Sequence, residues 1–339
     1  MLEKPALPDR LITGRVRRSF GIHLARLDFL PLGADVNTAV YRLEAVDGAA
    51  YFLKLRKGPF DRATVAVPRF LHAQGVPGII APLQTGSRRL WARLGGYRLF
   101  VYPFIAGDNG YHVELADRQW VGFGAALVAI HAASLPAALR RMVPCEDFSP
   151  RWRALVSEFQ VQVEQTTYPD PIASQLALFM QAHRDEIARL VCRAEELAGL
   201  IRSRPLHFVL CHSDLHPGNL LICPGGDFYI VDWDNPLLAP IERDLMFVGA
   251  GAVWSDPRQA ELFYQGYGPA PVDPRLLAYY RCERIVQDIA AFCQQLLLTD
   301  AGGEDRLQSF GYFTGQFEPG HEVPLALAPV PLSHWERAG

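Results

Sequence analysis

Residues 212–234, HSDLHPGNLLICPGGDFYIVDWD, constrain the fold of this chain more than any other stretch. Two short apolar runs, 220–222 and 229–231, are flanked by histidines, carboxylates and an amide. Proline and glycine interrupt the chain before and between these runs, so the stretch predicts a strand, a loop, a strand, a turn and a strand. Three interpretations of the polar groups compete: a zinc site, a catalytic carboxylate centre, or ordinary turn chemistry.

A zinc site made of His212, Asp214 and His216 is disfavoured. Two histidines four residues apart suit a metal on a helix, but Pro217 and Gly218 make this run a loop. No further histidine or cysteine stands at a useful spacing, and the HExxH motif is absent. Turn capping alone would account for one aspartate. It accounts less well for several polar groups on both sides of one hairpin.

The spacing of Asp214, Asn219 and Asp232 favours phosphoryl transfer. In that reaction a carboxylate orients the attacking hydroxyl, and hard oxygen ligands hold Mg²⁺ against the triphosphate. Protein kinases place these groups in an HRDxxxxN loop followed by an aspartate after the next hairpin. Asp214 and Asn219 have the same interval of five, and Asp232 follows the second apolar run. We therefore predict Asp214 as the catalytic carboxylate and Asn219 and Asp232 as Mg²⁺ ligands.

A kinase-type site also needs a cation and a covering turn for the phosphates of ATP. Lys54 lies in the predicted strand YFLKLRKG and is one of only three lysines in the chain. It suits a point-charge contact with phosphate, although a solvent-facing strand lysine is the alternative. The turn at 33–38 contains Asp35 and Asn37 and lies between the first two predicted strands, without a GxGxxG motif. We predict that Lys54, Asp35 and Asn37 bind the nucleotide.

The segment RLFVYPFIAG is predicted to join two lobes and to face adenine with its backbone. If Tyr102 ends the strand, Pro103 offers a carbonyl to the adenine amino group. Proline has no N–H, and none is required at that position. The Ile105 N–H can then donate to the adenine ring. Tyr102, Pro103 and Ile105 are therefore predicted adenine contacts.

The hydrophobic pattern predicts an α+β chain of two lobes. Residues 24–56 alternate as strands with a hairpin signal at Asp47–Gly48, and apolar residues from about 115 onward recur at helical spacing. We place the nucleotide-binding lobe at 1–105, the hinge at 102–107 and the helical catalytic lobe at 106–339. The elements expected besides the strands of 24–56 are a helix at 61–74, strands in RLWARL and YRLFVYPFI, and helical stretches at 117–133, 173–201 and 275–298.

Composition narrows the function classes. The net charge of −3 gives no general reason to bind nucleic acid, and 50% apolar residues suffice for a large core. No apolar segment is long enough to span a membrane, and MLEKPALPDR does not resemble a signal peptide. Six scattered cysteines without a CxxC pair are typical of reduced thiols. We expect a cytoplasmic protein with no nucleic-acid, membrane or protein partner.

With these motifs in place, the chain resembles the aminoglycoside phosphotransferase family nearly end to end. The resemblance is carried by YFLKL, YPFI, LCHSDLHPGNLL, IVDWDNPLLAPIERDLMF, YQGYG and YYRCERIVQDIA, and the last three blocks are similar to the branch that phosphorylates spectinomycin. It implies a bilobal protein-kinase-like fold, Mg-ATP as cosubstrate and the roles assigned above. The chain departs from the family in one respect. Family members usually pair the strand lysine with an acid on the following helix, whereas the helix expected at 61–74 offers only Asp61 as a partner for Lys54.

The acceptor is expected to be a small molecule. Only eleven residues separate Asp232 from Asp244, too few for a segment that positions a polypeptide. The resemblance implies an aminocyclitol antibiotic, spectinomycin, phosphorylated on its 9-hydroxyl to give resistance. Its two cationic methylamino groups call for nearby acids, and the expected ones are Asp234, Glu283 and Asp288.

Several alternatives remain open at this point. Within the kinase class the acceptor can be choline, methylthioribose, a macrolide or a different antibiotic. A nucleotide-binding pseudokinase and a metal-dependent phosphohydrolase are the alternatives from other classes.

Overall fold

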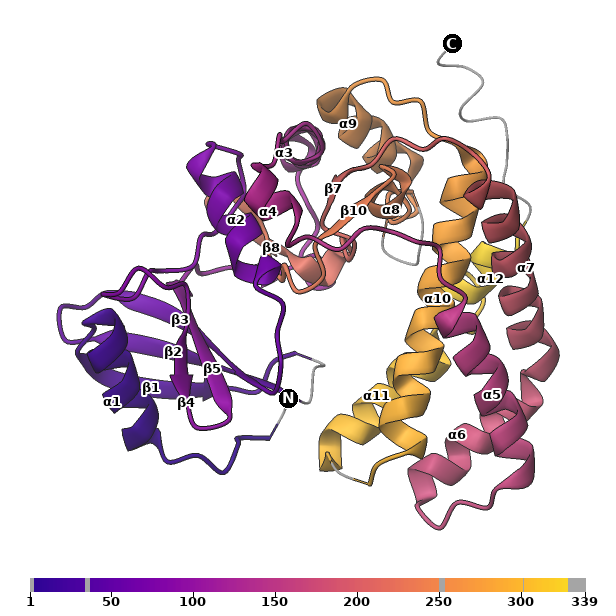
Figure 1. The fold of residues 1–339 in the computed structure, drawn as a ribbon, viewed down its shortest axis with the longest axis horizontal. Coiled ribbons are helices and arrows are strands. Elements are labelled where there is room, and N and C mark those ends of the chain that lie inside the picture. The colour runs from indigo at the N-terminus through magenta and orange to yellow at the C-terminus, as the bar shows by residue number, and fades with distance from the viewer. Residues whose placement is uncertain (1–2, 34–36, 250–253, 301, 329–339) are drawn as a thin grey trace.

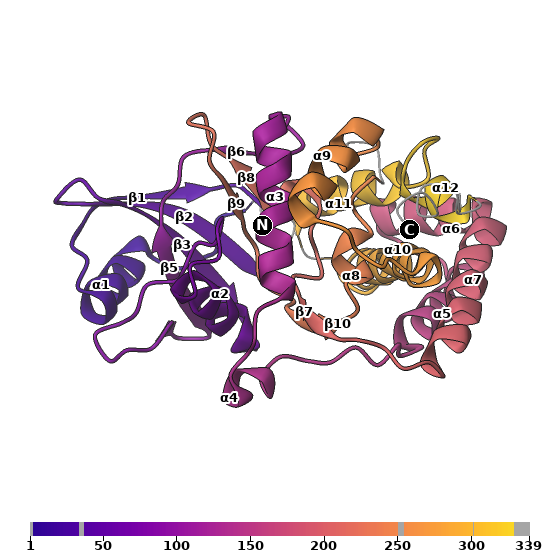
Figure 2. The same cartoon turned by 90° about the horizontal axis from the view of Figure 1, so that it is seen from above.

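The computed structural model describes residues 3–33, 37–249, 254–300 and 302–328. It confirms the α+β prediction: a small lobe built on an antiparallel sheet adjoins a larger, mainly helical lobe (Figure 1). Viewed from above, the sheet lies at one end of the molecule and the helices α5, α6 and α7 at the other (Figure 2). Two small sheets and α3 lie between them.

The small lobe contains a five-stranded sheet in the order β1-β2-β3-β5-β4. The Asp47–Gly48 turn joins β2 to β3 as predicted, and Gly48 has the positive φ of 85° that such a turn requires. Inward-facing strand residues form one apolar core with the first helix. The elements are α1 (Asp9–Phe20), β1 (Leu24–Leu30), β2 (Thr38–Ala45), β3 (Ala50–Lys57), β4 (Ala92–Leu94) and β5 (Tyr97–Pro103).

The helix α2 (Ala63–Ala73) belongs to the small lobe by sequence, but it packs elsewhere. Its buried residues Ala63, Val67 and Leu71 join the core cluster of the large lobe. Just after it, Ile79 forms a parallel bridge with Ile230, and Gly78 accepts a hydrogen bond of 2.7 Å from the Ile230 amide. The helix runs through Pro68 without ending there.

The 208–232 region forms short strands, as predicted, in two small sheets. One sheet has the order β6-β8-β9 and the other pairs β10 with β7. These strands hold the loops that carry the predicted site residues. Their bounds are β6 (Asp108–Asn109), β7 (Val209–Cys211), β8 (Leu220–Ile222), β9 (Phe228–Ile230) and β10 (Leu237–Ala239).

The helices of the large lobe surround two apolar clusters. The stretch 173–201 forms two helices rather than one, because the chain breaks at His183, whose ring stacks on Phe179 at 4.1 Å. Among the described residues, no helix has both the length and the apolar character needed to cross a bilayer. The helices are α3 (Asp117–His131), α4 (Ala137–Arg140), α5 (Arg151–Gln165), α6 (Pro171–Ala182), α7 (Arg184–Arg202), α8 (Glu242–Leu245), α9 (Pro257–Tyr267), α10 (Pro274–Leu297), α11 (Gly303–Gly315) and α12 (Glu322–Leu327).

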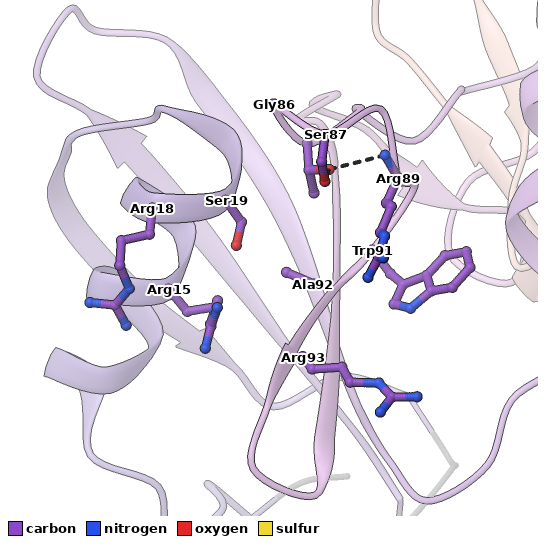
Figure 3. A pocket seen from close by; sticks show the side chains of 10 residues that line it. Arg15, Arg18, Ser19, Gly86, Ser87, Arg89, Trp91, Ala92 and Arg93 are labelled. Atoms are coloured by element: carbon purple, nitrogen blue, oxygen red, sulfur yellow. Dashed lines mark hydrogen bonds between the residues drawn. The ribbon is translucent and has the colours of Figure 1, made fainter.

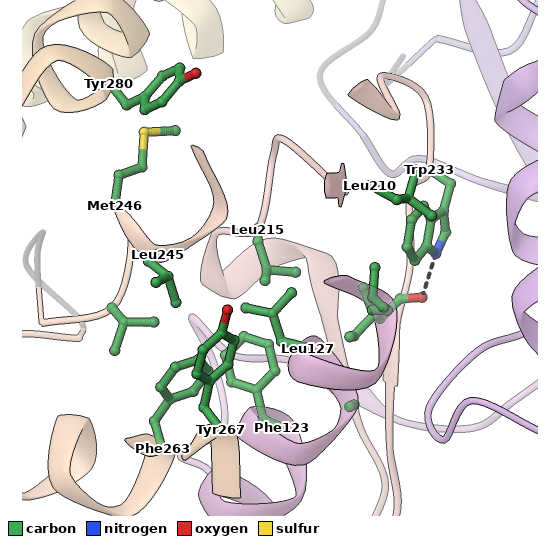
Figure 4. Packing of buried hydrophobic residues seen from close by; sticks show 14 of the residues in the cluster. Phe123, Leu127, Leu210, Leu215, Trp233, Leu245, Met246, Phe263, Tyr267 and Tyr280 are labelled. Carbon is green, nitrogen blue, oxygen red and sulfur yellow. Dashed lines mark hydrogen bonds between the residues drawn. The ribbon is translucent and has the colours of Figure 1, made fainter. Parts of the chain in front are cut away.

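Helices α3 and α9 approach each other closely because a glycine from each lies at the crossing. A Cβ added to Gly124 would lie 2.0 Å from the Phe263 carbonyl oxygen, and one added to Gly266 would lie 1.8 Å from that of Val121. On this contact the rings of Phe123 and Phe263 pack at 5.1 Å between centroids (Figure 4). The crossing fixes α3. This helix also carries His131, which contacts Asp244 beneath the loop that precedes Asp214.

The glycine contact generates the first prediction. Gly266→Ala should lower the free energy of unfolding by at least about 2 kcal/mol, because the methyl group meets backbone that has no room to move. Gly199→Ala is the matched control, since a Cβ there meets nothing within 4 Å. That control should be neutral or should raise stability by about 0.5–1 kcal/mol. Urea unfolding measures both, and equal effects would contradict the assigned close approach.

Candidate active site

The loop after β7 presents the carboxylate of Asp214, and buried hydrogen bonds fix its backbone. The amides of His212 and Ser213 both donate to Asp244, at 2.9 and 2.6 Å. Ser213 has a positive φ of 70°, an uncommon conformation for a residue with a side chain. The His212 imidazole donates from Nε2 to the Val231 carbonyl at 2.9 Å, and its Nδ1 accepts the Asp214 amide at 3.3 Å. His212 therefore braces the loop through both ring nitrogens.

Asp244 is itself held on its other side by the large-lobe core. His131 lies 3.1 Å from its Oδ2 and 2.7 Å from the Tyr267 hydroxyl, so the histidine on α3 is a satisfied core residue. Burial raises the pKa of Asp244, but the hydrogen bond and charge of His131 outweigh it and hold that pKa below its usual value. Burial also raises the pKa of the neighbouring Cys211 thiol, which leaves it protonated. His131 and Asp244 thus brace the loop, and the ligand atoms of these two residues and Cys211 lie within 4.8 Å of one another.

The predicted metal ligands, Asn219 and Asp232, lie beside each other. The Val231 amide donates to the Asn219 carbonyl at 2.9 Å, which sets the two positions side by side. The Asn219 side-chain nitrogen donates to the Asp214 carbonyl at 2.7 Å, which leaves its Oδ1 as the atom that can ligate a metal. Asp232 has a positive φ of 61°. A buried amide oxygen next to a carboxylate suits Mg²⁺, and the residues present therefore fit this ion.

Lys54 reaches across from β3 to the large lobe. Its ammonium group lies 2.7 Å from Asp232 and 2.8 Å from Asp234. Burial lowers the pKa of Lys54, but these two carboxylates raise it more, so the lysine stays charged. Asp234, a predicted substrate residue, is instead shared between Lys54 and Arg56, the latter at 2.8 Å. Asp61 is not the lysine's partner, because its carboxylate accepts an amide of the first turn of α2.

The predicted adenine segment has free backbone groups. Pro103 is the last residue of β5 and lies opposite Tyr51 in the sheet. The next amide, of residue 104, donates to the Ala50 carbonyl at 3.1 Å, which ends the pairing. The Ile105 amide makes no hydrogen bond within the described part of the chain. Tyr102 is half-buried in the same strand, and the adenine contacts of this segment stay a prediction.

The turn predicted to cover the phosphates is described only in part. The Asn37 carbonyl accepts the Lys57 amide at 2.8 Å, so the end of this turn is tied to β3. Asp35 lies outside the described residues.

A second group of charges contacts the Asp214 carboxylate. Arg284 on α10 donates from Nη1 to Asp214 and from Nε to Asp288, the latter at 2.9 Å. Burial raises the pKa of Asp214, but the charge of Arg284 outweighs it and lowers that pKa to about 2. Burial raises the pKa of Asp288 in spite of the same arginine. The structure therefore brings Asp288 to Asp214 through one guanidinium.

Glu283, the third predicted substrate acid, does not reach this group. Its side chain is buried and pairs with Arg153 on α5, which also bonds Glu195 at 2.6 Å. Glu283 and Asp288 are five residues apart, so they leave α10 in different directions, and helix packing decides which one faces Asp214. The structure gives Glu283 a buried ion pair with Arg153, and its role at the acceptor stays a prediction.

Sequence reasoning missed the aromatic residues around this group. Tyr111 stacks on His216 at 5.9 Å between ring centroids, and Phe247 lies under the Arg284 guanidinium at 5.9 Å. Burial lowers the pKa of His216, although Asp214 lies 3.7 Å from its Nε2. No local pattern marks these residues, since they meet from three separate segments. Arg56 could have been found from its alternation with Lys54 on the same strand face.

A separate hollow of about 390 Å³ lies on the small lobe beside β4 and is not part of this site. Its side chains come from α1 and from the segment before and within β4 (Figure 3). None of its arginines forms an ion pair with a described carboxylate. They are Arg15, Arg18, Arg89 and Arg93.

Comparisons with known proteins agree with this geometry. A sequence profile of the phosphotransferase enzyme family matches residues 28–280. The chain is similar to the crystal structure of spectinomycin phosphotransferase, APH(9)-Ia, in complex with ADP and spectinomycin, with 37% identity, a TM-score of 0.88 and coverage of 96% of this chain and 99% of that chain. The AMP-bound complex of the same protein matches with 36% identity, a TM-score of 0.85 and coverage of 95% and 99%.

More distant likenesses concern the fold alone. A microcompartment-associated aminopropanol kinase matches with 14% identity, a TM-score of 0.61 and coverage of 94% of this chain and 96% of that chain. No curated protein sequence matches the chain.

The brace under the catalytic loop generates the second prediction. Asp244→Ala should lower the free energy of unfolding by about 3–5 kcal/mol, because it leaves two buried amides and His131 without their acceptor. Asp256→Ala is the control, since Asp256 only caps α9 through the Arg258 amide and should cost about 1 kcal/mol. Chemical denaturation compares the two, and similar losses would show that Asp244 does not organise the loop.

Proposed function

Because the chain belongs to the phosphotransferase enzyme family, we propose that it transfers the γ-phosphoryl group of ATP to the 9-hydroxyl of spectinomycin and so confers resistance. As a member of the family it is a kinase-type phosphotransferase that uses a nucleotide and a hydroxyl acceptor. The observation that carries the proposal is the meeting of Lys54 with Asp232 beside Asp214, from two lobes, in a chain 37% identical to a spectinomycin phosphotransferase.

In the proposed reaction Asp214 orients the acceptor hydroxyl and takes its proton as the new O–P bond forms and the bond to ADP breaks. A carboxylate is a weak base, which suits a proton transferred late, when the oxygen has become acidic through bonding to phosphorus. Positioning and charge stabilisation then supply most of the rate.

Asn219 and Asp232 would hold Mg²⁺, which would neutralise phosphate charge when bound. Lys54 is placed to bind the phosphates of ATP once they replace its carboxylate partners, and Arg56 adds a second cation on the same strand. Tyr102, Pro103 and Ile105 would bind adenine, and Asn37 lies in the turn that faces the phosphates. Placement in the cytoplasm is part of the proposal, supported by six free cysteines.

The third prediction separates chemistry from nucleotide binding. Asp214→Asn should lower turnover by at least about 100-fold while Mg-ATP binding is kept, because general-base roles are worth roughly 10²–10⁴-fold. Asp232→Ala should instead lose Mg²⁺-dependent ATP binding, because it removes a predicted metal ligand. Calorimetric titration and steady-state kinetics distinguish the two. Asp227→Asn, an exposed acid in the β8–β9 turn, should change neither. If Asp214→Asn kept its turnover, Asp214 would not be the general base of the reaction.

The fourth prediction tests the acceptor. Purified protein incubated with Mg-ATP and spectinomycin should yield a product that is heavier by one phosphoryl group. Expression in a susceptible bacterium should raise resistance to spectinomycin and leave resistance to kanamycin unchanged, and Asp214→Asn is the inactive control. Turnover of choline, methylthioribose, a macrolide or another antibiotic, without spectinomycin turnover, would keep the kinase assignment and reject this acceptor.

A further inference from the structure

An oxygen of the Asp214 carboxylate, the predicted catalytic base, is bonded by a side chain of the protein itself. Arg284 inserts its guanidinium between Asp214 and Asp288 and bonds both carboxylates. The side chains of these three residues are exposed by only 24%, 24% and 29%, so the charges are partly withdrawn from water. The ring of Phe247 covers the guanidinium at 5.9 Å. This arrangement is a built contact rather than a surface ion pair.

The charges in this group do not balance. Two carboxylates, those of Asp214 and Asp288, face one guanidinium. Tyr111, stacked on His216, is neutral, since burial raises its pKa to about 12. The group is therefore one positive charge short. An additional cation that enters on this side would be attracted to it.

Arg284 also obstructs the group that must meet the acceptor. Its Nη1 donates to Oδ1 of Asp214, the carboxylate that is to receive the acceptor hydroxyl. A guanidinium cannot become neutral by losing a proton, so it cannot release the carboxylates by titration. The guanidinium can release the carboxylates only by moving away from them. The two carboxylates then need other cations as partners.

We propose that Arg284 is a specificity-determining residue that occupies the place of the acceptor's cationic groups. An acceptor with two ammonium groups exchanges with the guanidinium, pairs with Asp214 and Asp288, and brings its hydroxyl to Asp214. A neutral acceptor cannot replace the guanidinium and is excluded. This inference rests on the proposed function for its acceptor class, a dicationic aminocyclitol, whereas the internal cation site rests on the contacts of Arg284 alone.

Arg284→Ala tests the proposal, and Arg281→Ala is the matched control, because Arg281 lies on the same helix and bonds the Met246 carbonyl instead. Removal of the competing guanidinium should lower the KM for spectinomycin by about fivefold or more, the size expected for one partly exposed ion pair. The KM for ATP should change by less than about threefold, since Arg284 contacts no predicted nucleotide ligand. A raised KM for spectinomycin would overturn the proposal, because Arg284 would then help to bind the acceptor.

Chemical complementation supplies a readout that a merely structural role would not move. Ethylguanidinium should occupy the vacated place in Arg284→Ala and compete with spectinomycin, so that the KM returns toward the wild-type value. It should not compete in wild type or in Arg281→Ala. Failure to compete in Arg284→Ala would contradict the exchange. If Arg284→Ala does not fold, Arg284→Lys carries the test. Lysine replaces the planar, five-donor guanidinium with a compact ammonium on a shorter reach, so the KM should still fall at least about twofold, and an unchanged or higher KM would overturn the proposal.

A binding measurement separates this inference from the proposed function. Calorimetric titration of ethylguanidinium into Arg284→Ala needs no turnover, and the affinity should be at least tenfold higher, on the order of 1.4 kcal/mol, than for wild type or Arg281→Ala. If spectinomycin is not phosphorylated but ethylguanidinium binds selectively, the acceptor assignment fails and the internal cation site stands. Equal binding by all three proteins would overturn the site itself.

Discussion

Two amides of the catalytic loop share one buried carboxylate, and the geometry of the site depends on that contact. Asp244 accepts from His212 and Ser213 while His131 holds it from the opposite side. The loop can therefore keep Ser213 in a left-handed conformation that would otherwise be costly. Because the brace is made of large-lobe residues, Asp214 is positioned by the rigid part of the fold and not by the loop's own preferences.

The residues that belong to one local motif could be predicted from the sequence. Asp214, Asn219 and Asp232 lie within 19 positions, and turn and strand signals between them fix their order in space. The structure shows them beside one another, although their roles remain proposals. The five-stranded sheet and the hairpin at Asp47–Gly48 were equally predictable, because alternation and turn chemistry are local properties.

Contacts between distant segments could not be predicted in the same way. The partners of Lys54 stand 178 and 180 positions away, and nothing in the sequence favours Asp234 over Asp61. Likewise, Glu283 and Asp288 both lie on a predicted helix, but the rotation of that helix is set by its packing. Arg153 on α5 takes Glu283 into the interior and leaves Asp288 to Arg284. A helix acid can be recognised from sequence, whereas the direction in which it points is a tertiary property.

The packing of α2 defines which parts of the protein can move as rigid bodies. Its apolar face joins the large-lobe core, and the segment that follows it is bonded to β9. When the lobes shift, the sheet and α1 should therefore rotate past α2, with the bending concentrated in the chain on either side of that helix. In protein kinases the corresponding helix carries the acid that holds the lysine. Here Lys54 takes its acids from the large lobe, so α2 does not have to hold the lysine and packs with the large-lobe core instead.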